Sequence, residues 1–342
     1  NYMRKPVILI TGANGEIGHG LIKYLSNVKD MEILALDLDK LSKDIRIHVL
    51  DEIKGDILDK KLLERLNTEY EIREIYHLAA LLSTRAEFSP IIAHDVNVNG
   101  TLNLLNLAFE QAQSHGHSVK FFFPSSIAVY GINSIEEKNN VGPIIETQYL
   151  SPKTMYGCNK LYCEQLGVYF SNNFQQLSAN FKPQLLDFRS IRFPGLISPF
   201  TMPNGGTSDF IPEMLHNAAR NLNYKSFVDE NTKIPFMTMS DGINAIIKLM
   251  ESPLENLSQN VYHITSFSPS AGEFKRMIES YFSNCEIGFE INLSRQNIVN
   301  SWPEDLNDSK ARDDWNWFPK YDFKNAMEKY LIPHVKELYK IK

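Results

Sequence analysis

The chain has 342 residues, of which 43% are hydrophobic and 22% are charged, and its formal net charge is -6. This length and composition are typical of a globular protein with a sizeable core. The negative net charge argues against nucleic acid as a partner, because nucleic-acid-binding proteins need a basic face. No apolar run approaches the roughly 20 residues of a membrane span, so we expect no membrane partner either.

The N-terminus and the cysteines indicate a cytoplasmic protein. Residues 1–6 lead directly into an apolar run, so we expect no signal peptide, and Met3 is a candidate for the native start. Cys158, Cys163 and Cys285 are odd in number and lack metal-ligand spacing. This pattern favours reduced thiols over disulfides, and the spacing of His, Cys and carboxylate residues predicts no metal site.

The first predicted elements surround a glycine-rich turn. The apolar run 6–10 predicts a strand that is buried on both faces, as in a parallel sheet. It leads into Gly12, Gly15 and Gly18 with the spacing G-x-x-G-x-x-G, and a helical pattern follows. A strand, such a turn and a helix are the context of a dinucleotide fingerprint, in which N–H groups at the helix start bind the pyrophosphate. The alternative is a tight turn that only packs the helix on the strand.

An acidic residue after the second strand indicates which dinucleotide is bound. Residues 31–36 predict that strand, and Asp37 follows Gly18 by 19 positions, near the roughly 20 expected for the acid that binds the adenosine ribose. A carboxylate there repels a 2′-phosphate, so it favours NAD over NADP. Asp39 is the competing position, but it lies further beyond the apolar run.

The next segment offers candidates for contact with the adenine. We expect a short strand at 47–50, followed by Asp56 and Ile57, an acid and an apolar residue. Asp56 is equally explained as the N-cap of a helix that starts at Ile57.

The fourth predicted strand and its exit span residues 74–80. Its last residues, Ala79 and Ala80, are small enough to allow close approach of a cofactor. A loop is expected at 81–84 and a long helix at 95–112, where Asn97 is placed to tie the helix to the sheet.

The fifth predicted strand, at 119–123, delivers two hydroxyl groups. Ser125 and Ser126 follow it directly, and the carboxyl ends of central strands are where α/β sheets bind ligands. A polar loop at 132–150 then leads to the next helix.

Tyr156 and Lys160 stand four residues apart on a helix that is predicted to begin at Pro152. Positions i and i+4 share one helix face. A nearby ammonium favours the phenolate and lowers the tyrosine pKa from its usual value of about 10. The pair is therefore a candidate proton-transfer device, although an incidental Tyr and Lys on a surface helix give the same spacing.

The strand predicted at 185–193 ends the alternation of strands and helices, which indicates an α/β fold with a Rossmann-type, doubly wound parallel sheet. We place an NAD-binding domain with the Ser, Tyr and Lys in residues 3–195. Residues 196–342 are expected to form a smaller C-terminal α/β substrate-binding region, with the chain crossing between the two. That region should contain a loop at 194–210, strands at 226–228, 234–237 and 261–264, helices at 210–222, 240–251, 270–282 and 323–339, and Trp302, Trp315 and Trp317 as packing residues.

In this order and spacing, the glycine turn, Ser126, and Tyr156-x-x-x-Lys160 resemble the extended short-chain dehydrogenase/reductase superfamily, which includes the NAD-dependent sugar epimerases and dehydratases. Several longer stretches are similar to the short-chain type of L-threonine 3-dehydrogenase. These are residues 77–83, 96–101, 124–131, 154–157, 189–198, 205–210 and 301–303.

The resemblance implies oxidation of the secondary alcohol of L-threonine to 2-amino-3-oxobutanoate, with hydride transfer to NAD. Tyr156 would be the base, Lys160 would lower its pKa and hold the nicotinamide ribose, and Ser126 would orient the hydroxyl. A homodimer through the helices at 95–112 and 152–172 is also implied. As in other enzymes with long loops beside a site, we expect the loop at 198–210 to close over the substrate as a lid. The cofactor contacts expected are Gly12, Asn14, Gly15, Glu16, Ile17, Gly18, Asp37, Asp56, Ile57, Leu78, Ala79, Ala80, Asn97, Tyr156 and Lys160. The substrate contacts expected are Ser83, Ser125, Ser126, Tyr156 and Thr207.

Two other functions fit parts of the pattern. A nucleotide-sugar epimerase or dehydratase would use the same Tyr156, Lys160 and NAD, but it needs cations for a sugar diphosphate. The C-terminal half has no compact basic cluster, and Ser126 is followed by Ile127 and Ala128 in place of a dehydratase's acid pair. A catalytically silent NAD-sensing protein would be expected to lack the tyrosine or the lysine.

Overall fold

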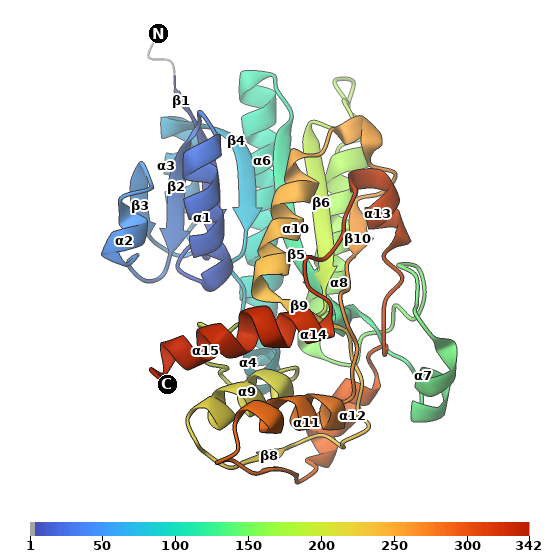
Figure 1. Cartoon of the computed structure of the whole chain (residues 1–342). Coiled ribbons are helices and arrows are strands. Elements are labelled where there is room, and N and C mark those ends of the chain that lie inside the picture. The colour runs from blue at the N-terminus through green and yellow to red at the C-terminus, as the bar shows by residue number, and fades with distance from the viewer. Residues whose placement is uncertain (1–3, 342) are drawn as a thin grey trace.

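A computed structural model describes residues 4–341, and its centre is one parallel sheet (Figure 1). Seven strands hydrogen-bond in the order β10-β6-β5-β4-β1-β2-β3, and every pair is parallel. This arrangement confirms the predicted doubly wound sheet. The strands are β1 (Lys5–Thr11), β2 (Glu32–Asp37), β3 (Asp51–Lys54), β4 (Tyr70–His77), β5 (Val119–Ser126), β6 (Leu186–Phe193) and β10 (Val261–His263).

Two helical layers cover the sheet, and each has its own apolar core. In β1, Ile8 and Ile10 belong to one core, while Val7 and Leu9 belong to the other. Successive strand residues point to opposite faces, so a strand covered on both sides must be apolar throughout. The first layer holds α1 (Glu16–Val28), α10 (Met239–Glu251) and α13 (Ser309–Trp315), and the second holds α3 (Lys60–Glu69), α6 (Gly100–His115) and α8 (Met155–Asn172).

A third core belongs to a smaller α/β region beyond the carboxyl ends of the central strands (Figure 1). It includes two small parallel sheets, β7 with β9 and β8 with β11. The chain after residue 195 also returns to the main sheet through β10 and its helices. The elements of the smaller region are β7 (Gly195–Ile197), α9 (Phe210–Ala219), β8 (Tyr224–Ser226), β9 (Phe236–Thr238), α11 (Ala271–Tyr281), β11 (Ile287–Phe289), α12 (Leu293–Asn300), α14 (Phe323–Asn325), η4 (Ala326–Leu331) and α15 (Ile332–Leu338). Short helices elsewhere are α2 (Lys43–Arg46), α4 (Ser83–Phe88), α5 (Pro90–His94), η1 (Asp95–Asn99), η2 (Ile127–Val129), α7 (Ile135–Val141) and η3 (Leu254–Asn256).

Two predictions near β3 are wrong. The strand expected at 47–50 lies instead at 51–54, where Ile53 is the one buried side chain, so the strand has no apolar run to reveal it. The helix that follows is capped by Asp59, whose Oδ1 accepts hydrogen bonds from Lys61 N and Leu62 N. The carboxylate of Asp56 instead accepts from Leu58 N at 2.9 Å.

Two expected loops contain helices, and one helix begins later than predicted. The segment expected as a loop at 81–84 starts α4 at Ser83, and the expected loop at 132–150 contains α7. The helix with Tyr156 begins at Met155 because Thr154 caps it, its Oγ1 accepting from Gly157 N at 3.0 Å. Pro152 therefore precedes the helix. No helix within residues 4–341 combines the length and the apolar character that are needed to cross a membrane.

Candidate functional site

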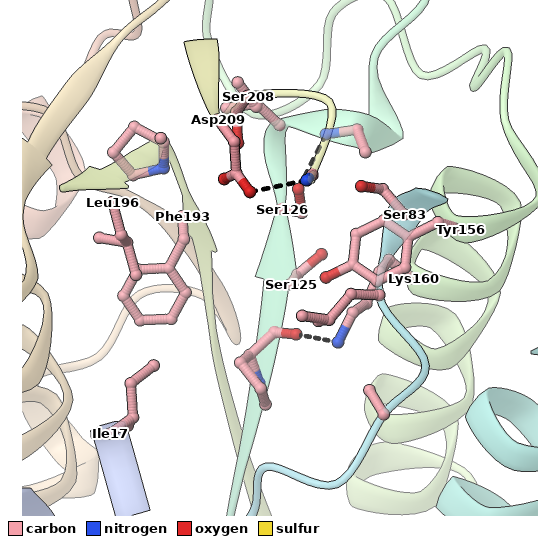
Figure 2. Close-up of a pocket in the computed structure, with 18 of the residues that line it drawn as sticks. Ile17, Ser83, Ser125, Ser126, Tyr156, Lys160, Phe193, Leu196, Ser208 and Asp209 are labelled. Carbon is pink, nitrogen blue, oxygen red and sulfur yellow. Dashed lines mark hydrogen bonds between the residues drawn. The ribbon is translucent and has the colours of Figure 1, made fainter. Parts of the chain in front are cut away.

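A cavity of about 330 Å³ opens at the carboxyl end of β5 (Figure 2). This volume is in the range of small-molecule sites. Its lining brings together many residues that the sequence predicts: Ile17, Leu78, Ala80, Ser83, Ser125, Ser126, Tyr156 and Lys160. Trp302, expected as a packing residue, also lines the cavity, whereas Trp315 and Trp317 lie in an apolar core.

Tyr156 and Lys160 lie on the face of α8 that borders the cavity. Besides the Thr154 cap, Oε1 of Glu87 accepts a hydrogen bond from Met155 N at 2.6 Å, so the helix start is held by two elements. Lys160 Nζ lies 5.4 Å from the centroid of the Tyr156 ring and donates to Pro124 O at 2.6 Å. The i, i+4 geometry predicted from the sequence is therefore present.

In this structure burial determines the direction of the Tyr156 pKa, and the lowering expected from Lys160 is not seen. Burial raises the pKa of Tyr156 above its usual value, and burial lowers the pKa of Lys160 to about 8. Removing either group from water disfavours its charged form. One of the three N–H groups of the ammonium is donated to Pro124 O, and the other two remain available to a ligand.

The two serines at the end of β5 have different partners. Ser126 is half-buried, and its Oγ accepts from Ala128 N at 3.1 Å, which leaves its hydroxyl proton available to a ligand. Ser125 is buried and donates to Glu164 Oε1. Glu164 in turn accepts from Arg192 Nε at 2.9 Å and Nη2 at 2.7 Å. This buried ion pair fixes the end of β5 beside α8, and sequence reasoning missed it.

The glycine turn has the geometry that a dinucleotide needs. Gly12 has φ +64°, and a Cβ on it would lie 2.6 Å from Ala79 N, so glycine is required there by the exit of β4. A Cβ on Gly18 would lie 2.4 Å from Ala13 O. A Cβ on Gly15 would lie 3.6 Å from Gly12 O, an ordinary van der Waals contact. Packing therefore requires two of the glycines but not the third, which lies at the start of α1, where first-turn N–H groups have no helical partner.

Asp37 lies where the ribose-binding acid is expected, at the carboxyl end of β2. Its Oδ2 accepts from Asn14 N at 2.9 Å and its Oδ1 from Asp39 N at 3.0 Å. The carboxylate is thereby held next to the glycine turn. These contacts fit the adenosine ribose of a dinucleotide, whose hydroxyls would donate to the remaining acceptor positions.

The other expected cofactor residues are engaged within the protein. The Glu16 carboxylate accepts from the hydroxyls of Ser198 and Thr201, both at 2.6 Å, and so joins α1 to the loop after β7. Ile57 is only 4% exposed and packs in a core. Asn97 exchanges hydrogen bonds with the backbone of Leu81, N to Oδ1 at 2.7 Å and Nδ2 to O at 3.0 Å. Its partner is thus the segment after β4, and not the sheet as predicted.

The segment 204–209 contributes Asn204, Gly206, Ser208 and Asp209 to the wall of the cavity. Thr207 does not line the cavity itself; its N and Oγ1 both lie 3.4 Å from Ser83 Oγ. Asp209 does line it, and its Oδ2 accepts from Gly206 N at 2.6 Å. Arg295 from α12 donates to Gly206 O at 2.9 Å. The sequence analysis gave no role to Asp209 or Arg295. Asp209 lies in the stretch 205–210 that carries the family resemblance, whereas Arg295 belongs to no stretch that was singled out.

Comparison with known proteins places the chain in a family. A model of the NAD dependent epimerase/dehydratase family matches residues 8–265. The chain belongs to that family. It is 36% identical over 339 residues to an uncharacterized epimerase/dehydratase of Staphylococcus aureus strain USA300, covering 96% of this chain and 97% of that protein.

Solved structures of family relatives superpose over nearly the whole chain. A monomeric L-threonine 3-dehydrogenase of metagenomic origin has a TM-score of 0.82 and 34% identity, covering 97% of this chain and all of the other (100%). L-threonine 3-dehydrogenase from Trypanosoma brucei has a TM-score of 0.82 and 33% identity, covering 98% of both chains. These findings confirm the expected extended short-chain dehydrogenase/reductase fold. They show an enzyme family that uses a nicotinamide dinucleotide.

Proposed function

We propose that the chain is an L-threonine 3-dehydrogenase that oxidises the secondary alcohol of L-threonine to 2-amino-3-oxobutanoate with NAD. The observation that carries this proposal is the cavity, in which Ser126, Tyr156 and Lys160 face a wall that holds one carboxylate, Asp209. A small zwitterion fits that mixture of charges. Likeness over the full length to structures of L-threonine dehydrogenases supports the same substrate.

The residues of the cavity have different roles in the oxidation of the alcohol. Ser126 donates a hydrogen bond to the substrate oxygen and orients it, and Tyr156 accepts the hydroxyl proton at its phenolic oxygen. Because burial raises the pKa of Tyr156, the cost of the phenolate must be offset, and Lys160 is the cation that borders the cavity. NAD, when bound, accepts the hydride from the substrate carbon.

Two features of the glycine turn support NAD as the cofactor. Gly15, which packing does not require to be glycine, and the free N–H groups at the start of α1 suit a pyrophosphate. The Asp37 carboxylate disfavours the 2′-phosphate of NADP by charge repulsion. We expect kcat/KM to be at least tenfold higher with NAD than with NADP, a difference of about 1.4 kcal/mol. Equal values for the two cofactors would contradict this assignment.

The direct test is NADH formation by the purified protein with L-threonine and NAD. Tyr156→Phe removes the proton acceptor and should abolish the reaction, with a loss of at least about a thousandfold in kcat. Tyr162→Phe is the matched control, since Tyr162 is an exposed tyrosine on the same helix, and it should keep wild-type activity. No NADH from folded, NAD-binding wild-type protein would remove L-threonine as the substrate.

A nucleotide-sugar epimerase is the alternative within the family, and it would become the preferred proposal if L-threonine were not oxidised. Such an enzyme binds a diphosphate, for which arginine pairs are the usual partners. Within the described chain, the cavity lining contains one cation, Lys160, and Asp209 opposes an anionic ligand. This balance of charge favours an amino acid over a sugar nucleotide.

We also propose that the protein forms a homodimer through α6 and α8. Leu102 on α6 and Tyr162 and Tyr169 on α8 are exposed, and Phe88 and Ile91 extend the apolar surface next to them. Apolar residues gathered on one face are typical of an interface. Light scattering should give twice the monomer mass, whereas Tyr162→Glu should give monomers. A wild-type monomer, as the name of the metagenomic relative describes, would contradict the dimer.

A further inference from the structure

Asp209 is the single carboxylate among the described side chains that line the cavity. It occupies the N-cap position of α9, where an aspartate usually binds the first helical N–H groups. Its side chain makes no such bond and turns instead to Gly206 N, at 2.6 Å from Oδ2. In the view of Figure 2, the Asp209 carboxylate is drawn to the left of Ser126 and Tyr156 to the right of it. The carboxylate is therefore turned from the first turn of α9 toward Gly206, and both residues line the cavity.

The Asp209 carboxylate has hydrogen-bond acceptor positions that no described group occupies. A carboxylate offers about four lone-pair sites, and Gly206 N uses one of them. None of the ion pairs within residues 4–341 includes Asp209. A half-buried carboxylate with no cationic partner is well placed to bind a cation that arrives with the ligand.

Contacts from two other elements hold the turn that carries this carboxylate. Thr84 on α4 donates to Gly205 O at 2.7 Å, and Arg295 on α12 donates to Gly206 O at 2.9 Å. The Gly206 carbonyl is thus fixed by Arg295, while its amide is fixed by Asp209. A side chain held in this way loses little conformational entropy when it binds a ligand.

We infer that Asp209 binds the α-ammonium group of the substrate and thereby selects 2-amino-3-hydroxy acids over hydroxy acids that lack the amine. The inference rests on the proposed function. In such a substrate the ammonium-bearing carbon is bonded directly to the carbon that carries the alcohol. A group that binds the ammonium must therefore lie in the same small cavity as Ser126 and Tyr156, as Asp209 does.

Asp209→Asn is the sharpest variant, because the amide oxygen keeps an acceptor for Gly206 N while the charge is lost. We expect KM for L-threonine to rise at least tenfold, which corresponds to about 1.4 kcal/mol. The inhibition constant of 3-hydroxybutanoate, which has the alcohol and the carboxylate but no amine, should stay within about twofold. Asp313→Asn, at an exposed position on α13, is the matched control and should change neither constant.

The outcomes separate this inference from the proposed function. Equal weakening of L-threonine and 3-hydroxybutanoate by Asp209→Asn would mean that the residue only supports the turn, and an unchanged KM would overturn the inference as well. If the variant does not fold, the affinities of the wild type for L-threonine and 3-hydroxybutanoate test the inference. Equal affinity for the two compounds would contradict recognition of the ammonium. A wild type that oxidises no L-threonine refutes the proposed function first and the ammonium site with it.

Discussion

Lys138 offers a test of the electrostatics of this fold away from the cavity. It lies on α7, its side chain is 1% exposed, and its Nζ donates to Val299 O at 3.1 Å. Burial lowers its pKa from 10.5 to about 8. At about 1.4 kcal/mol per pH unit, the folded state is destabilised by roughly 3 kcal/mol when the lysine is charged. Lys138→Met removes the charge at similar volume and loses one hydrogen bond worth about 1 kcal/mol.

The sign of the pH dependence follows from the lowered pKa. Below pH 8, Lys138 is charged in the folded and the unfolded chain, so the wild type bears the full cost. Between pH 8 and 10.5 the unfolded chain still binds a proton that the folded chain has released, and the free energy of unfolding rises with pH. The variant lacks this titration. We therefore expect Lys138→Met to be more stable than wild type by about 2 kcal/mol at pH 7. This difference should shrink as the pH rises, and near pH 10.5 the wild type should become the more stable protein because it keeps the hydrogen bond to Val299 O.

Urea denaturation of both proteins at neutral pH and at roughly pH 10 measures this difference directly. Lys324→Met is the control, because that lysine is exposed on α14 and its removal should leave stability unchanged at either pH. The reasoning fails if Lys138→Met is less stable than wild type at neutral pH. It also fails if the difference between the two proteins is the same at both pH values, since the lysine would then not titrate in that range.

Three further substitutions test the contacts around the cavity. Glu164 is fully buried and holds Arg192 by two hydrogen bonds, so Glu164→Gln should lower the free energy of unfolding by roughly 3–5 kcal/mol in chemical denaturation, and a loss under about 1 kcal/mol would contradict this. Gly12→Ala places a Cβ 2.6 Å from Ala79 N at a φ of +64°, so the affinity for NAD, measured by fluorescence titration, should fall at least tenfold. An unchanged affinity would argue against the glycine turn as the NAD-binding site. Glu16→Gln weakens the contacts to the loop after β7, so proteolysis within that loop should become faster and KM for L-threonine should rise about fivefold. Equal proteolysis rates in the variant and the wild type would show that Glu16 does not restrain the loop.

The strands of the sheet interior were predictable because burial on both faces leaves a strong signal. In β1 the even-numbered isoleucines enter one core and Val7 and Leu9 enter the other, so the sequence is apolar without interruption. β3 is the edge strand, with one neighbour in the sheet and Ile53 as its buried residue. Its polar sequence carries no such signal, and the apolar run at 47–50, with Ile47 78% exposed, suggested a strand four residues too early.

The parts of the site that the sequence revealed are those set by local geometry. The glycine turn and the i, i+4 spacing of Tyr156 and Lys160 each depend on a few consecutive residues. The contacts that could not be predicted from the sequence join distant segments. Arg192 bonds to Glu164, 28 positions away, and Arg295 bonds to Gly206, 89 positions away. No periodicity links such positions, so only the folded chain brings them together. The direction of the pKa shift of Tyr156 could not be predicted for a related reason, because desolvation depends on every group packed around the phenol.

The helix α4, whose first two residues fall within the loop predicted at 81–84, contacts the segments on both sides of the cavity. Ser83 Oγ lies 3.4 Å from Thr207 N, and Thr84 donates to Gly205 O, so its first turn contacts the turn that carries Asp209. One turn later, Glu87 accepts a hydrogen bond from Met155 N, the residue before Tyr156. The substrate wall and the proton acceptor thus depend on one six-residue helix. A helix this short gains little stability from its own hydrogen bonds, so these contacts at its two ends stabilise α4 as much as α4 positions the groups around the cavity.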